Sequence, residues 1–166
     1  MLQSSKVLWG EGLFLRPQHF QRQDAYHEWR LAEGLRALHP YAFGVRKCKI
    51  DTDALQSGVL RFTELQIVFP DGEFYAAPSE DDLPEPVSLA LLPAGATEFV
   101  WHAAIAPMRS TGANSAGGDA PADASLRFQK ASQGAADWFT GAAAAEMVVS
   151  SAWCASCPST NRVTTL

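Results

Sequence analysis

The sequence predicts a mainly β domain with one helix near its amino end. Residues 17–38 show helical spacing of apolar side chains, whereas residues 41–107 alternate at period two between turn signals. The chain has 166 residues, of which 47% are hydrophobic, and this is enough for one core of ordinary size. Several short strands joined by hairpin turns are typical of an antiparallel β-sandwich or barrel.

The segment 17–38 is predicted to be the helix. Pro17 suits a first helical turn, where its missing N–H is not needed, and His39-Pro40 ends the helix because a residue before proline avoids helical angles. A row at steps of three and four contains Phe20, His27, Leu31, Leu35 and Leu38, with Asp24 filling its one polar place. Tyr26 and Trp29 face another way, so we expect both sides of the helix to be covered.

Strands are predicted over residues 41–107 and 125–149. The run from Val59 to Phe69 closes on the turn signal Pro70-Asp71-Gly72, and residues 73–76 return as its hairpin partner. Residues 79–86 form an acidic loop broken by proline, and residues 87–92 and 98–106 predict two further strands. Residues 109–124 are rich in Gly, Ala, Ser and Asp, which predicts a mobile loop.

Charge and composition exclude several classes of function. The formal net charge is −5 and the 13 Lys and Arg residues are scattered, so no basic patch for nucleic acid is expected. No apolar stretch is long enough for membrane insertion, and no secretory apolar core follows the first residues. Three cysteines without an export signal indicate a reducing, cytoplasmic location.

Residues that could carry chemistry do not form a convincing active site. Cys154 and Cys157 have the spacing of a redox dithiol or of half a zinc site, but Pro158 follows and no second ligand pair exists. His27 and His102 fit packed positions, and the acids of residues 80–85 lack the spacing of a calcium loop. We therefore predict no catalytic residue, no metal and no cofactor, with a small metal or thiol enzyme using Cys154 and Cys157 as the weakest alternative.

The first thirty residues carry an unusual load of large aromatic side chains: Trp9, Phe14, Phe20, Tyr26 and Trp29. A segment this apolar ahead of the first helix either completes the sheet or is buried by another chain. Composition alone leaves these two possibilities open.

A specific motif spans residues 7–24. It reads Trp9-x-Glu11-Gly12, then apolar residues, then Pro17-Gln18-His19-Phe20-Gln21-x-Gln23-Asp24. This run resembles the amino-terminal signature of the TssK family, also called VasE or ImpJ, of type VI secretion baseplate proteins. A weaker match follows at residues 137–141 and 145–149, so the resemblance covers about residues 5–149.

The resemblance implies a structural role without catalysis. Members of the family have an amino-terminal β-sandwich like the shoulder of phage receptor-binding proteins, form trimers, and dock onto the TssF and TssG wedge proteins at the cytoplasmic side of the secretion apparatus. Candidate partner-binding residues are those of the signature: Trp9, Glu11, Phe14, Pro17, Gln18, His19 and Phe20. A phage-tail adaptor or receptor-binding-type structural protein of the same sandwich type is the alternative.

The chain departs from the family pattern near its carboxyl end. The resemblance implies that a helical bundle and a membrane-complex-binding head follow the shoulder domain, and no residues here match them. We therefore expect residues 1–149 to form the shoulder domain of a truncated member. Residues 150–166, which are rich in Ser and Thr, are expected to be an aberrant or disordered tail.

Overall fold

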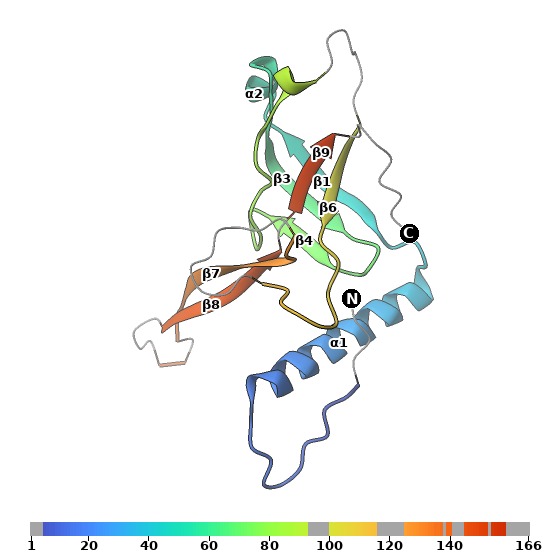
Figure 1. Cartoon of the computed structure of the whole chain (residues 1–166), viewed down its shortest axis with the longest axis vertical. Coiled ribbons are helices and arrows are strands. Elements are labelled where there is room, and N and C mark those ends of the chain that lie inside the picture. Colours follow the sequence, from blue (N-terminus) through green and yellow to red (C-terminus); the bar gives the residue numbers. More distant parts are fainter. Residues whose placement is uncertain are drawn as a thin grey trace.

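The computed structural model describes residues 5–92, 100–115, 125–137, 139–140, 145–152 and 154–158. It is built mainly of strands, with one long helix, α1 (Pro17–Leu38), ahead of them (Figure 1). All pairings between the named strands are antiparallel. The predicted class, mainly β and antiparallel with one amino-terminal helix, is confirmed.

The largest sheet has three strands in the order β1 (Gly44–Ile50), β3 (Phe62–Val68) and β4 (Phe74–Ala77). The turn between β3 and β4 is the predicted Pro70-Asp71-Gly72. Its ends are joined by hydrogen bonds from the Phe69 amide to the Glu73 carbonyl, 2.8 Å, and from the Gly72 amide to the Phe69 carbonyl, 2.9 Å. Gly72 has φ of +96°, a conformation that favours glycine.

A second layer, β6 (Trp101–Ile105) paired with β9 (Cys154–Pro158), lies over this sheet (Figure 1). The core between the layers joins Leu65, Ile67 and Tyr75 of the three-stranded sheet to Cys154 of β9, with Ile105 packed against them. Tyr75 is fully buried. Two layers with a shared apolar core make this a β-sandwich.

The carboxyl end differs from the disorder that we expected after residue 149. Strand β8 (Ala145–Ala152) continues through that boundary, and residues 154–158 pair with β6 as β9. Ala152 and Cys154 are both buried in the core. Both side chains are small and pack against the large residues of the sheet. Because they are small, the sequence shows no hydrophobic periodicity that would have predicted their burial. Residues 159–166 lie outside the described residues.

The strands predicted between residues 51 and 92 are shorter and more often interrupted in the structure. A short helix, α2 (Thr52–Gln56), follows β1 because the Asp51 side chain accepts hydrogen bonds from the amides of Asp53 and Ala54, both 3.0 Å. The predicted strand 59–69 is divided into β2 (Val59–Leu60) and β3. The strand expected over residues 87–92 is limited to β5 (Val87–Ser88), and a single 3-10 turn, Leu89–Leu91, follows it.

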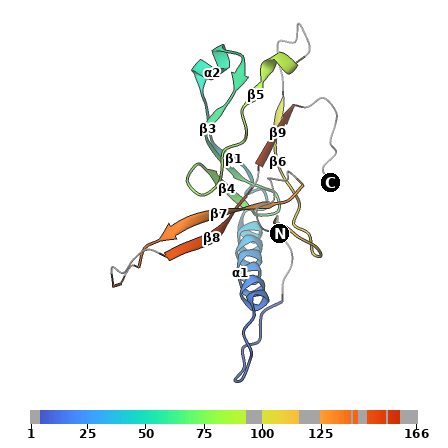
Figure 2. The ribbon, with the colours of Figure 1, turned by 60° about the vertical axis from the view of Figure 1, so that its left-hand side comes forward.

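Strands β7 (Phe128–Ala135) and β8 form a two-stranded arm that extends away from the sandwich, as both views show (Figures 1 and 2). Its base is buried at Ser151 and Ala152, whereas Met147 and Val148 farther out are exposed. The expected mobile loop 109–124 is described for residues 109–115. Asn114 closes a turn there through its side-chain oxygen and nitrogen on the Arg109 amide and carbonyl, at 2.7 and 3.0 Å.

Candidate docking surface

Residues 5–16 form an open loop that leads into α1 and extends beyond the body of the sandwich (Figure 1). The loop turns at Gly12, with φ of +78°, and the Leu13 amide donates to the Gly10 carbonyl, 3.3 Å. The motif that the sequence singles out is therefore a projecting loop and the first turns of a helix.

His19 and Pro17 organise the start of α1. The Arg16 amide donates to Nδ1 of His19 over 3.0 Å, and the His19 amide donates to the Arg16 carbonyl over 2.9 Å. The bond to Nδ1 is the His19 half of a capping box, with histidine in the place where glutamate or glutamine is usual. The His19 amide bonds a backbone carbonyl, because an arginine side chain has no acceptor. Pro17 occupies the first turn, where no N–H is required.

Trp9 folds back onto the first turns of the helix. Its ring centroid lies 6.2 Å from that of His19 and 6.3 Å from that of Phe20, in tilted geometry. The structure thus brings together three of the seven predicted partner-binding residues. Glu11, Phe14 and Gln18 are exposed outside this cluster, and Phe14 is 80% exposed.

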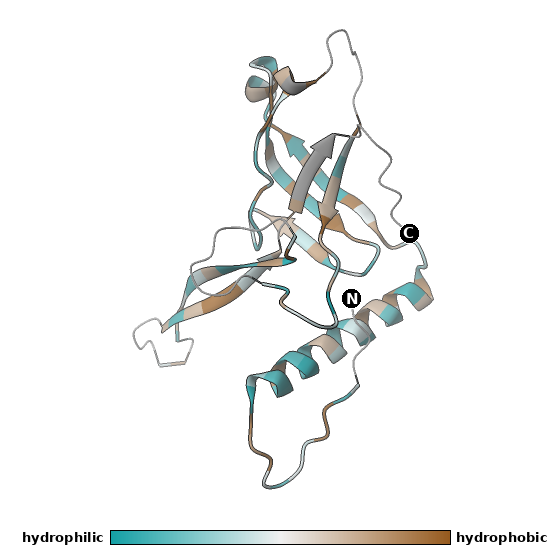
Figure 3. Ribbon diagram, viewed as in Figure 1, coloured by the Kyte–Doolittle hydropathy of each residue, from teal (hydrophilic) through white to brown (hydrophobic). Residues whose placement is uncertain are grey.

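We define the amino-terminal surface as loop 5–16 with the first turns of α1. Besides Trp9 and Phe14, it exposes Leu8, Leu15 and Phe20. Apolar colouring follows the loop in Figure 3. Apolar side chains gathered on a projecting loop are the pattern of a surface that another protein covers.

The outer face of α1 is also bare, in contrast to the expectation that both faces are covered. Leu31 and Leu38 are 68% and 75% exposed, and Leu35 is about half exposed. Of the 22 residues of α1, all of which the structure describes, Ala32 alone is buried. The expected apolar row exists, but within this chain it faces outward.

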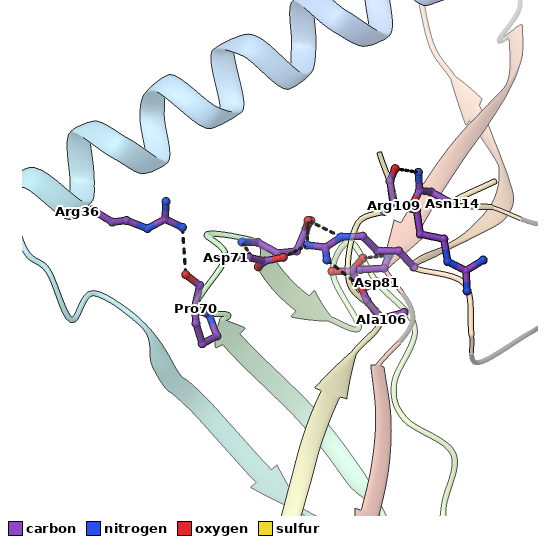
Figure 4. A network of polar contacts seen from close by, with 10 residues as sticks. Arg36, Pro70, Asp71, Asp81, Ala106, Arg109 and Asn114 are labelled. Atoms are coloured by element: carbon purple, nitrogen blue, oxygen red, sulfur yellow. Dashed lines mark hydrogen bonds and ion pairs between the residues drawn. The ribbon is translucent and has the colours of Figure 1, made fainter. Parts of the chain in front are cut away.

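The inner face of α1 contacts the turn between β3 and β4. Nη2 of Arg36 donates to the Pro70 carbonyl over 3.0 Å, as Figure 4 shows, and Ala32 lies directly over Gly72. Arg36 also pairs with Glu33 on the helix itself. The β3–β4 turn is therefore a contact site of α1 on the sandwich.

Arg127, which the sequence analysis did not single out, binds the acidic residues of the same turn. Its side chain is 1% exposed, and its Nη2 lies 2.7 Å from both Asp71 Oδ2 and Glu73 Oε2. Its Nη1 donates to the Ala106 carbonyl, 2.9 Å, just after β6. The one sequence cue is an arginine within the alternating residues 125–130, where its burial is not visible.

These contacts perturb the neighbouring carboxyl groups. Burial alone would raise the pKa of Asp71, but the Glu73 amide and the Arg127 charge together hold it below its usual value. Loss of hydration, followed by the charges of Glu73 and Asp24, raises the pKa of Glu28 on α1, with Arg127 opposing. Charged side chains thus connect this turn both to α1, through Arg36, and to the base of the arm, through Arg127.

The acidic loop 79–86 is a structural clamp. The Asp81 carboxylate accepts the Ala76 amide at 2.9 Å and the Ala152 amide at 2.6 Å, which ties β4 to β8. The buried Tyr75 hydroxyl donates to the Asp82 carbonyl. Asp81 thus has a local structural role that requires no bound cation.

The cysteines do not resemble a thiol site. Residues 154–158 are an extended strand, whereas a reactive C-x-x-C opens a helix, and Cys154 is buried in the core. Within the described ranges, no group of three or more His, Cys, Asp or Glu side chains is placed to hold a metal. None of the helices that the structure describes is both long and apolar enough to span a membrane.

The chain matches a known protein family. Residues 19–155 match the family model described as Bacterial Type VI secretion, with the members EvfL, ImpJ and VasE. Over 86 residues the chain is 36% identical to the type VI secretion system baseplate component TssK1 of Pseudomonas aeruginosa. That match covers 52% of this chain and 19% of TssK1, so the aligned part is less than two thirds of that relative's length.

The fold is similar to solved TssK structures. The TssK-TssF-TssG baseplate subcomplex contains a chain that matches 97% of this one with a TM-score of 0.85 at 21% identity, over 53% of that chain. A crystal structure of TssK matches 98% of this chain with a TM-score of 0.82 at 19% identity, over 36% of that chain. At these identities the likeness concerns the fold.

Proposed function

Because the chain belongs to the bacterial type VI secretion family of EvfL, ImpJ and VasE, we propose that it is a structural adaptor of the secretion baseplate. Its chemistry in this role is binding, without a catalytic centre. In this role the protein would act at the cytoplasmic side of the secretion apparatus.

The exposed amino-terminal surface is the observation that carries this proposal. Trp9 and Phe20 lie in contact and are each about half exposed, and Phe14 extends beyond them. Large, rigid aromatic side chains dominate the energy of protein interfaces, because they bury much area at little entropic cost. Polar neighbours such as Glu11 and Gln18 are suited to the rim of such an interface.

The partners that we propose are TssF and TssG. Support comes from a subcomplex in which a chain of the same fold is assembled with proteins of those names. The exposed row Leu31, Leu35 and Leu38 is a separate apolar surface on the same helix. We assign that row to self-association, with the trimer of the family as the expected state.

Binding to purified TssF–TssG tests the role of the amino-terminal surface. We expect the double variant Trp9→Ala/Phe14→Ala to bind at least about a hundredfold more weakly, because aromatic hot spots are each worth about 2 kcal/mol or more. Tyr41→Ala is the matched control, since Tyr41 is an 86% exposed aromatic residue beyond the other end of α1.

Isothermal titration calorimetry gives the affinities, and circular dichroism checks that each variant is folded. Equal binding by the double variant and the wild type would remove the amino-terminal surface from the interface. Absence of binding by the folded wild type would refute the proposed partners.

A further inference from the structure

Helix α1 contacts the sandwich at the turn between β3 and β4. Among its residues Ala32 is the buried one, and it lies over the turn 70–73, while Arg36 bonds to the Pro70 carbonyl of the same turn. The carboxyl end of α1 continues through residues 39–43 into β1, and its amino end carries the amino-terminal surface. The orientation of α1 therefore depends on its height above this turn.

Gly72 sets that height. A Cβ atom built on Gly72 would lie 2.9 Å from Cβ of Ala32, closer than side-chain carbons approach in folded proteins. The helix is thus as near to the turn as a glycine permits. The Arg36 guanidinium, whose Nη2 would lie 3.5 Å from the same position, borders the contact.

Arg127 keeps the turn itself from moving. Its guanidinium bonds Asp71 and Glu73, which flank Gly72, and also the Ala106 carbonyl after β6. Arg127 therefore connects the turn to the segment that follows β6 in the second layer of the sandwich. A change at Gly72 is expected to displace the helix rather than the turn.

The length of the helix amplifies such a displacement. At 1.5 Å per residue, Ala32 is about 9 Å from Leu38 and Pro17 is about 31 Å from it. If α1 pivots at its tethered carboxyl end, lifting Ala32 by about 1 Å moves Pro17 by about 3 to 4 Å.

We propose that Gly72 is a positioning residue for partner docking, because its close contact with Ala32 sets the angle of α1 and hence the place of the amino-terminal surface. This inference rests on the proposed docking function. The inference predicts a coupling between Gly72 and Ala32, both of which lie outside the amino-terminal surface.

The first test measures the position of the helix without any partner. Spin labels are placed on the exposed Cys48 of β1 and on Gln21→Cys near the start of α1, in a Cys157→Ser background. Electron–electron double resonance then gives the label distance. We expect Gly72→Ala to shift it by about 3 Å and the double variant Gly72→Ala/Ala32→Gly to restore it.

Gly58→Ala is the matched control for backbone strain. Gly58 has φ of +79° in a turn, but a Cβ there would meet nothing within 4 Å. Ala32→Gly alone measures the effect of glycine on the helix. Ala32→Val approaches the turn from the helix side without positive-φ strain, and it replaces Gly72→Ala if that variant does not fold. An unchanged distance in Gly72→Ala or Ala32→Val would overturn the inference.

The second test measures TssF–TssG affinity for the same variants. We expect Gly72→Ala to bind about tenfold more weakly, Gly58→Ala to bind like the wild type, and Ala32→Gly to rescue the Gly72→Ala defect. Loss of affinity that Ala32→Gly does not rescue would overturn the inference while leaving the docking function intact. If the wild type does not bind, the proposed function fails, and the label distances still decide whether Gly72 positions the helix.

Discussion

Arg127 holds a full positive charge almost out of reach of water, and three acceptors from two other segments surround its guanidinium. The two carboxylates, Asp71 and Glu73, remain about a quarter exposed at the edge of the cluster. At the scale of single residues, this ion cluster is the joint that connects the base of the arm, the β3–β4 turn and the end of β6.

Replacing Arg127 is expected to be costly. Arg127→Met leaves Asp71 and Glu73 close together without their cation, and we expect it to lower the free energy of unfolding by about 3–5 kcal/mol. Arg61→Met is the control, because Arg61 pairs with Asp51 at the exposed surface and its loss costs much less. Urea unfolding measures both, and a similar loss in the two variants would contradict a special role for Arg127.

Asp71 makes part of this stability depend on pH. Its pKa lies below the ordinary value of 3.8, so its contribution is present above that value and is lost as the pH falls through the lower folded-state pKa. We expect Asp71→Asn to cost about 1–2 kcal/mol at pH 7. Thermal melts of both proteins should converge by about pH 2, and a gap that persists at low pH would show that charge is not the cause.

At the scale of elements, α1 and the β7–β8 arm both project from the sandwich (Figure 2). The helix has little tertiary packing, since Ala32 is its one buried residue, so its local signals matter more than usual. Such signals include the cap formed by His19 and the proline at position 17. Both the His19 cap and Pro17 stabilise the first turn of α1.

The cap can be tested by substitution of His19. His19→Ala removes the acceptor for the Arg16 amide, and we expect a loss of about 0.5–1 kcal/mol with faster hydrogen exchange in the first turn. His19→Gln retains an acceptor in the third helical position and should preserve most of the protection. Equal exchange in the alanine variant and the wild type would mean that Pro17 and Trp9 suffice to begin the helix.

At the scale of the whole molecule, a compact sandwich carries two separate apolar surfaces on α1. One is the amino-terminal surface, and the other is the row Leu31, Leu35 and Leu38. Exposed leucines in one helical row are a strong drive toward association. We propose different partners for the two surfaces.

Self-association through the leucine row gives a further prediction. We expect the wild type to form an oligomer and Leu31→Glu/Leu38→Glu to be a monomer, because charged side chains cannot be buried unpaired at an interface. Light scattering with size-exclusion chromatography measures the mass. The control Trp9→Ala/Phe14→Ala should remain oligomeric, and a monomeric wild type would exclude this use of the row.

Local sequence signals predicted much of the structure. The helix appears over Pro17–Leu38 because proline stands at each end of a periodic segment, and the β3–β4 hairpin appears at Pro70-Asp71-Gly72 because that turn chemistry is local. The signature at residues 7–24 resembles the family whose model matches residues 19–155. The seven candidate docking residues remain a proposal, although the structure does bring Trp9, His19 and Phe20 together.

The sequence by itself thus determined the strand-rich class, the helix and the family, since each depends on residues close together in the chain. Tertiary structure alone decided that the leucine row faces outward, that Cys154–Pro158 pairs with β6, and that Arg127 is buried against Asp71 and Glu73 of the β3–β4 turn. Each of these depends on contacts between residues about 20 to 60 positions apart, such as Arg127 with Ala106, 21 residues away, and with Glu73, 54 residues away. Hydrophobic periodicity and turn motifs report the conformational preferences of neighbouring residues. Burial, in contrast, depends on how the layers of the sandwich pack together.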